Sequence, residues 1–253
     1  MSDASQTTRT RAPTILRGTT SPQGLSVRQI VRHVVSTQPC GSPGCTIDRL
    51  VDIADACVRL GAQRQVLTAG LATQEALDRL VQIAAGRETA RRLAADERAA
   101  VVSLQSDMRT RLNHILSDWR LAGERFTRLT CLLPAQLTGA WPTLPALDMA
   151  QRQALERAVA VVLGRDFERA RDRHASAQRR WLRATQDVER ADEECRRIDQ
   201  AFRAGQCSVL NLARARWQRQ RQVESQLHAE ADRLVSQHVM DLLARPASAL
   251  TVV

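Results

Sequence analysis

The chain has 253 residues and a formal net charge of +10, because 37 basic residues, all arginine, face 27 acidic ones. Only 3% of the residues are aromatic, and the abundance of Ala, Leu, Arg, Gln and Glu favours helices over strands. The arginines are interspersed with Asp and Glu instead of clustered, so the sequence predicts solvated helix faces, and no nucleic-acid partner is expected.

The first 24 residues are polar and rich in Arg, Thr and Ser, which is typical of a disordered leader. This segment, 1–24, has no apolar core of the kind that a secretory signal peptide contains. No later stretch approaches the roughly 18 uninterrupted apolar residues of a membrane-spanning helix. If the start of the sequence is correct, we therefore expect a cytoplasmic location.

The region 25–131 is predicted to be helical. Ser26 caps a first helix, and Thr46 caps a second one after the turn sequence PCGSPGC. Gly61 and Gly70 are expected to separate this second helix from a long helical region. The apolar positions of that region recur every three or four residues, at Val101, Leu104, Met108, Leu112, Ile115 and Trp119.

Two cysteines lie close together in the first turn sequence. Cys40 and Cys45, with His33 and Cys57 on either side, admit three interpretations: a metal site, a disulfide in an exported protein, or a Gly/Pro turn. Their spacing matches no common zinc module, so we favour the turn and expect neither a metal nor a cofactor.

A Pro/Gly-rich linker, 132–147, separates the two halves, and a long helix is expected to begin at Asp148. Its seam positions alternate spacings of three and four, which is typical of a coiled coil. One of the two alternating positions is nearly always alanine, which predicts close packing of a neighbouring helix. The predicted packing seam is Phe167, Ala170, Ala177, Trp181, Ala184, Val188, Ala191 and Ile198.

A glycine ends this long helix. Gly205 is suited to a left-handed C-terminal turn, and Ser208 is placed to cap a returning helix. The sequence therefore predicts an antiparallel hairpin over 148–245, with its tip near 203–208 and a short tail, 246–253. The fold class is expected to be all-α, built of long antiparallel helices with no substantial sheet.

These features resemble the outer-membrane efflux proteins of the TolC type. Phe202, Gly205, Ser208 and Leu212 match an aromatic-x-x-Gly-x-x-Ser-x-x-x-Leu pattern before a returning helix. The segment RLTCLLPAQLTGAWPTLPALD is similar to the link between the family's two repeats. GLSVRQIVRHVVSTQP is similar to the family's opening helix, with Gln38 replacing the usual Asn.

The resemblance implies a trimer whose helices form a tunnel across the periplasm. It also implies docking to a periplasmic adaptor and, through it, to an inner-membrane pump, with an outer-membrane or periplasmic location. By this resemblance the partner-binding residues at the tip are Arg203, Gly205, Gln206, Ser208 and Leu210. The chain lacks alternating segments of the length and aromatic content of membrane strands, so it resembles a short, barrel-less or truncated member.

A second class of protein fits the same hairpin. Cytoplasmic coiled-coil proteins of export machines, such as the stalk protein of type III secretion, are also Arg/Gln/Ala-rich hairpins. A first half that forms an independent bundle, without packing alongside the hairpin, would favour this alternative.

Catalysis is not expected from this sequence. It contains no phosphate-binding loop, no Ser-His-Asp arrangement with usable context and no His/Glu metal helix. His174 and His238 fall on apolar seams, where we interpret them as packed side chains. The acidic run 192–194 lies beside arginines, so we interpret it as a solvated helix face.

Overall fold

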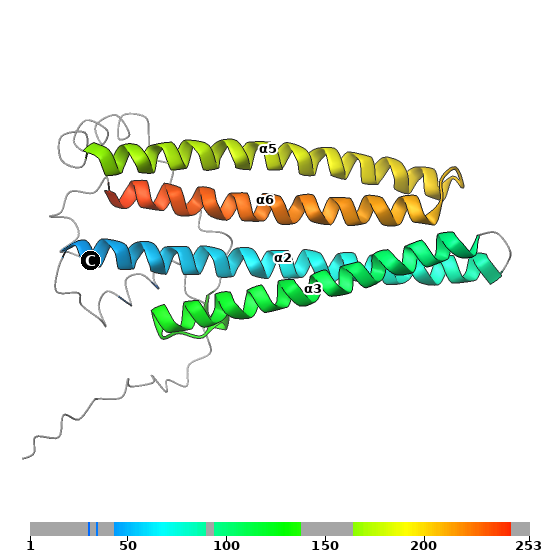
Figure 1. Ribbon diagram of the computed structural model, residues 1–253, viewed down its shortest axis with the longest axis horizontal. Helices are drawn as coiled ribbons and strands as arrows, with labels where there is room; N and C mark the ends of the chain where they lie inside the picture. The colour runs from blue at the N-terminus through cyan, green and yellow to red at the C-terminus, as the bar shows by residue number, and fades with distance from the viewer. Residues whose placement is uncertain (1–29, 31–33, 35–42, 90–93, 138–163, 244–253) are drawn as a thin grey trace, which may run out of the picture.

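The fold is all-α, as the sequence predicts. The computed structural model describes residues 30, 34, 43–89, 94–137 and 164–243, and of these the side chains of 43–48, 50, 164–167 and 242–243 are left aside. The described elements are α2 (Pro43–Thr89), α3 (Ala95–Thr130), the 3-10 helix η1 (Pro134–Gln136), α5 (Gly164–Arg203) and α6 (Val209–Leu243) (Figure 1).

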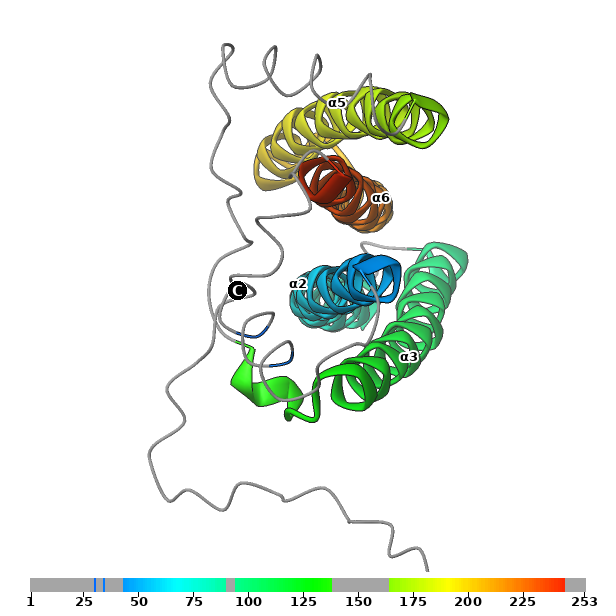
Figure 2. The same ribbon diagram turned by 90° about the vertical axis from the view of Figure 1, so that its left-hand side faces the viewer.

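The four long helices form two antiparallel hairpins that lie side by side. One hairpin is α2 with α3 and the other is α5 with α6, and the two are joined chiefly by contacts between α2 and α6. Figure 2 shows α6 between α5 and the first hairpin. The end of α2 and the turn after α5 lie at the same end of the molecule (Figure 1).

The two helices of the second hairpin are buried to different extents. α6 packs against α5, α2 and α3, whereas α5 packs extensively only against α6. On α5 the fully enclosed positions are three alanines of the predicted seam, Ala170, Ala177 and Ala184. Because alanine has so small a side chain, α6 can approach α5 closely along this line.

Apolar clusters follow one another along the bundle. The cluster farthest from the tips contains Ile30 and Val34, the two described residues of the predicted first helix, packed with Phe126. The cluster at the tip end joins three helices and contains Leu77, Leu80, Ala84, Val101, Met108, Val209, Leu212 and Ala213. The core therefore consists of successive clusters: one within the first hairpin and three that also contain residues of α6.

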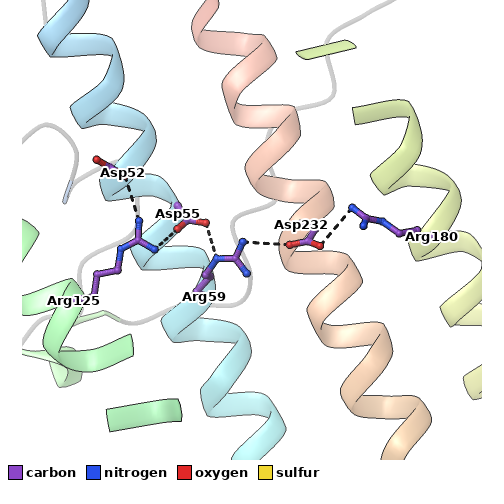
Figure 3. Close-up of polar contacts among 6 residues, drawn as sticks. All are labelled: Asp52, Asp55, Arg59, Arg125, Arg180 and Asp232. Carbon is purple, nitrogen blue, oxygen red and sulfur yellow. Dashed lines mark hydrogen bonds and ion pairs between the residues drawn. The ribbon is translucent and has the colours of Figure 1, made fainter. Parts of the chain in front are cut away.

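A chain of ion pairs crosses all four helices away from the tips. It runs through Arg125 of α3, Asp52, Asp55 and Arg59 of α2, Asp232 of α6 and Arg180 of α5 (Figure 3). Arg59 Nη2 lies 3.3 Å from Asp232 Oδ1, and Arg180 Nη2 lies 3.5 Å from Asp232 Oδ2. Asp55 is buried, whereas Arg59, Asp232 and Arg180 are partly exposed, so the two pairs of Asp232 add little to stability.

The helix boundaries predicted at Thr46, Gly61 and Gly70 are wrong. α2 runs without interruption through Gly61 and Gly70, and it already begins at Pro43, which places Thr46 inside the helix. A Cβ at Gly70 would lie 3.2 Å from Leu112 Cδ1, so this glycine allows α3 to pack closely against α2.

The long helical region expected after Gly70 is in fact divided. α2 ends at Thr89, and α3 begins after Ala94, whose backbone is extended with φ −77° and ψ 147°. Neither glycine nor proline stands between Thr89 and Ala95, so the sequence carries no breaker there. The hairpin instead follows from the antiparallel packing of two long apolar faces, and residues 90–93 lie outside the described part.

The first residues of the predicted linker 132–147 belong to the core. α3 closes at Cys131, which has φ 57° and whose N–H donates to the Thr127 carbonyl at 2.8 Å. The chain then folds back, and Pro134 Cγ lies 3.2 Å from the position of a Cβ on Gly123. Leu132 and Leu137 are buried in the cluster that contains Phe126. Residues 138–163, including the predicted helix start at Asp148, lie outside the described part.

Candidate docking site at the hairpin tip

The turn after α5 closes the helix with two backbone hydrogen bonds. The Gly205 N–H donates to the Phe202 carbonyl at 3.0 Å, and the Gln206 N–H donates to the Ala201 carbonyl at 2.8 Å. This nested pair is a Schellman motif, which needs a residue with positive φ at its centre. Gly205 has φ +72°, and a Cβ there would meet no atom within 4 Å. Glycine is therefore required by the backbone conformation and not by crowding.

Ser208 begins the returning helix. Its Oγ accepts a hydrogen bond from the Asn211 N–H at 3.3 Å, which is the arrangement of an N-cap. Directly after it, Val209 is fully buried in the tip-end cluster. Cys207 donates from Sγ to the Ile198 carbonyl at 3.4 Å, so the turn is also held to the last turns of α5.

The first hairpin supports the tip of the second. The Leu210 N–H donates to Glu97 Oε1 of α3 at 3.4 Å, which satisfies one of the open N–H groups of the α6 N-terminus. The guanidinium carbon of Arg87 on α2 lies 4.5 Å from the ring centre of Phe202. The tip of the second hairpin therefore contacts both α2 and α3.

The five predicted tip residues divide into two groups. Arg203, Gly205 and Gln206 are exposed, whereas Ser208 and Leu210 are half-buried. Arg203 Nη2 pairs with Asp199 Oδ2 at 2.7 Å, Ser208 is engaged as the cap, and Leu210 packs against the tip-end cluster. Arg203, Gly205 and Gln206 thus form the part of the tip that a partner could reach, and the partner contact itself stays a prediction.

Two grooves flank the tip. One, of about 700 Å³, lies between α2, α5 and α6, and Arg203 lines it together with three alanines of α2. The other, of about 610 Å³, lies between α5 and α6, and Gln206 lines it with Asn211, Arg214 and Gln218. The two exposed polar residues of the tip therefore reach into different grooves, both of which could accommodate the side chains of a partner.

Charges near the tip are largely paired. Arg197 donates to both carboxylate oxygens of Glu194, at 2.9 and 2.7 Å, and these hydrogen bonds lower the pKa of Glu194. Asp192 of the first groove pairs with Arg219 of α6. The acidic run 192–194 is thus solvated or paired with arginine, and the surface offers both signs of charge to a polar partner.

The predicted packing seam lies on the side of α5 that faces α6. Besides its three buried alanines, its remaining described side chains are half-buried: Trp181, Val188, Ala191 and Ile198. The Arg233 guanidinium carbon of α6 lies 4.7 Å from the Trp181 ring. The backbone of Phe167 is helical, and its side chain is outside the described part.

A buried polar group on α6 was not predicted from the sequence. Gln220 and Glu224 are 1% and 6% exposed, and they contact Thr73 of α2 and Arg111 of α3. Continuing the alternation of four and three from Ala213 through Trp217 would have placed both residues on the seam.

No group of three or more His, Cys, Asp or Glu side chains within the described ranges is placed to hold a metal ion. Cys40 and the side chain of Cys45 lie outside those ranges. Burial raises the pKa of Cys57 to about 12, so this thiol stays protonated at neutral pH and is a poor nucleophile or ligand. His174 Nδ1 lies 3.2 Å from Ser236 Oγ, between α5 and α6.

None of the helices in the described ranges is both long enough and apolar enough to cross a membrane. No protein-family model matches the sequence, and no curated protein matches it. A solved structure of the outer-membrane channel OprN is similar to this one, with a TM-score of 0.63 and 12% sequence identity, over 86% of this chain and 70% of that chain. The long helical hairpins described above are therefore a fold that this chain shares with an outer-membrane channel.

Proposed function

We propose that this protein is a non-catalytic helical component of an outer-membrane efflux or secretion conduit, and that its hairpin tip docks to a periplasmic adaptor. The observation that carries the proposal is the exposed Schellman turn at Gly205, supported from behind by α3, in a fold shared with an outer-membrane channel. By the resemblance, the adaptor would connect it to an inner-membrane pump.

The unequal burial of the helices supports self-association. α5 packs extensively only against α6, and its outer face is exposed and rich in arginine, with Leu182 47% exposed. An edge helix of this kind can pack against an edge helix of another copy. We therefore propose a homo-oligomer, a trimer by the resemblance, in which α5 contributes to the contact between copies.

The cytoplasmic stalk alternative receives less support. It would be favoured by a first half that folds apart from the hairpin, whereas α2 and α3 both pack against α6. The tip-end cluster contains residues from α2, α3 and α6, so these helices share one core.

Photo-cross-linking in the native host tests the docking. The photoreactive amino acid benzoylphenylalanine, placed at the exposed Gln206, should form an adduct with a periplasmic adaptor that mass spectrometry identifies. The same amino acid at the exposed Arg171, far from the tip on α5, serves as the matched control and should not form that adduct. Absence of an adaptor adduct at both positions would argue against docking through the tip.

Two variants refine this test. Gly205→Val places a β-branched residue at φ +72° and should sharply reduce the adduct, because the turn must rearrange. Ala204→Val changes the neighbouring exposed residue, which does not have positive φ, and should leave the adduct in place. Helicity, measured by circular dichroism, should be retained in both; an undiminished adduct with Gly205→Val would contradict the proposed role of the turn.

A further inference from the structure

Four polar side chains meet inside the bundle, away from the tip and from the proposed docking. Thr73 of α2 donates from Oγ1 to Gln220 Oε1 at 3.0 Å, and Gln220 Nε2 donates to Glu224 Oε1 at 3.2 Å. Arg111 of α3 donates to Glu224 Oε2 from Nε at 3.0 Å and from Nη2 at 2.7 Å. We call these four residues the polar layer.

Three of the four side chains of the polar layer are enclosed. Gln220, Glu224 and Thr73 are 1%, 6% and 8% exposed, whereas the side chain of Arg111 is 39% exposed and reaches Glu224 from the edge of the bundle. The apolar clusters on the two sides of the layer contain Leu77, Met108, Leu212 and Ala213 toward the tips, and Val66, Ile115 and Leu227 away from them. Three helices of two different hairpins thus contribute to one polar level between two apolar clusters.

The apolar seam of α6 does not by itself fix the axial position of α6 relative to α2. Its small and large residues repeat at steps of four and three, so a shift of about one turn, roughly 5.4 Å, would again place apolar residues against α2. The same shift would move the Glu224 carboxylate against apolar side chains and remove the partner of Arg111. A buried charge without its partner is strongly unfavourable, whereas a buried pair gains little over apolar residues of similar size.

We propose that the polar layer fixes the axial register of the second hairpin against the first. By excluding shifted arrangements it keeps the start of α6 beside the start of α3, where Glu97 can reach the Leu210 N–H. The hydrogen bonds from Arg111 to Glu224 raise the pKa of Arg111, in keeping with a permanently charged pair. This register device concerns the fold and does not depend on the proposed docking.

Cross-link mapping on the full chain tests the register. Benzoylphenylalanine at Ala72, an exposed residue of α2, would face the groove that Arg216 and Arg219 of α6 also line. In the wild-type protein we expect adducts on one segment of α6, around these two arginines. In the double variant Arg111→Leu/Glu224→Leu we expect adducts on two segments of α6. The second segment should lie about one turn (roughly 3.6 residues) from the first and carry a comparable fraction of the adducts.

The thermal midpoint of this double variant should stay close to that of the wild type, because replacing an enclosed carboxylate and its partly exposed partner by apolar residues is often near neutral. A folded double variant whose adducts remain on the single wild-type segment would overturn the proposal. If the double variant does not fold, Arg111→Met/Glu224→Gln, which removes both charges with little change in side-chain volume, decides the question by the same readout.

The exposed ion pairs of Figure 3 supply the matched control. Arg59→Ala/Asp232→Ala removes a pair that also joins α2 to α6, but its carboxylate side chain, Asp232, is 37% exposed, compared with 8% for Glu224. We expect its adducts to stay on the wild-type segment, since exposed pairs contribute little. A split pattern in this control would mean that register is set by surface charge, and it would also overturn the proposal.

Discussion

The two helices of the second hairpin differ in composition and in surroundings: α5 contains one leucine and eleven arginines, whereas α6 contains six leucines and five arginines. α6 is enclosed by three other helices, and its buried residues include Leu212, Gln220 and Glu224. α5 contacts mainly α6, and its fully buried residues are alanines. Heptad spacing therefore shows which side of a helix is buried, but not how many neighbours bury it.

This difference has an energetic consequence. A large apolar side chain on α6 is surrounded by protein, so removing it leaves a cavity. On α5 the small seam residues set the distance to α6, so enlarging one of them should force the helices apart. The following predictions compare the two helices, in order of decreasing expected effect.

The largest effect is expected from truncating an enclosed leucine. Leu212→Ala on α6, where the side chain is 2% exposed, should lower the free energy of unfolding by about 2–5 kcal/mol, as typical for cavity-forming changes. Leu182→Ala on α5, where the side chain is 47% exposed, should change it by less than about 0.5 kcal/mol. Urea unfolding followed by circular dichroism measures both; equal losses would contradict the enclosed position of α6.

A smaller loss is expected from enlarging the α5 seam. Ala184→Leu inserts a larger side chain at a position that is 7% exposed and should cost about 1–3 kcal/mol. Arg183→Leu introduces the same residue at the adjacent exposed position and should be close to neutral. If both variants unfold at the same denaturant concentration, the close α5–α6 contact is not present.

The start of α6 should show a moderate effect. Ser208→Ala removes the oxygen that accepts the Asn211 N–H and should cost about 1 kcal/mol. Ser208→Asp keeps an acceptor at this position and should largely retain the stability. Thermal unfolding of the three proteins under the same conditions gives the comparison, and an unaffected Ser208→Ala variant would show that the cap contributes nothing.

The smallest effect is expected in the pH dependence. Burial raises the pKa of Glu230 on α6 above its ordinary 4.5, so its contribution to stability declines as pH rises from that value through the folded pKa. Hydrogen bonds from Arg197 lower the pKa of Glu194 on α5, so its contribution is present above 4.5 and is lost as pH falls through its lower folded pKa.

Two substitutions should therefore shift the thermal midpoint in opposite directions at pH 7. Glu230→Gln should raise it slightly, and Glu194→Gln should lower it slightly. Both differences should shrink in acid, where the native carboxyls are protonated. Shifts of the same sign at pH 7 would contradict the assigned surroundings of the two side chains.

Local signals in the sequence predicted the second hairpin well. Gly205 is a signal for the end of a helix, and Ser208, three residues later, is a signal for the start of the next one. Both act through local backbone conformation and hydrogen bonding, so they could be identified without tertiary information. The same rule failed at Gly70, because there the absence of a side chain permits α3 to approach and does not interrupt α2.

Other features depend on contacts between distant segments. The division between α2 and α3 has no glycine or proline, and the polar layer brings together residues such as Thr73 and Gln220 from separate hairpins. At the candidate site, the sequence indicated which residues surround the turn. It could not show that Leu210 faces the core while Gln206 is exposed, because that depends on where α3 packs.

Location in the cell distinguishes the proposed conduit component from a cytoplasmic coiled-coil assembly. A C-terminally tagged copy, expressed in the native host from its own upstream DNA, should be followed through cytosol, periplasm and both membranes. The proposed conduit component is expected in the periplasmic or outer-membrane fraction, alongside a known marker of that compartment. Recovery in the cytosol alone would contradict the conduit and would leave the two hairpins as a cytoplasmic coiled-coil assembly.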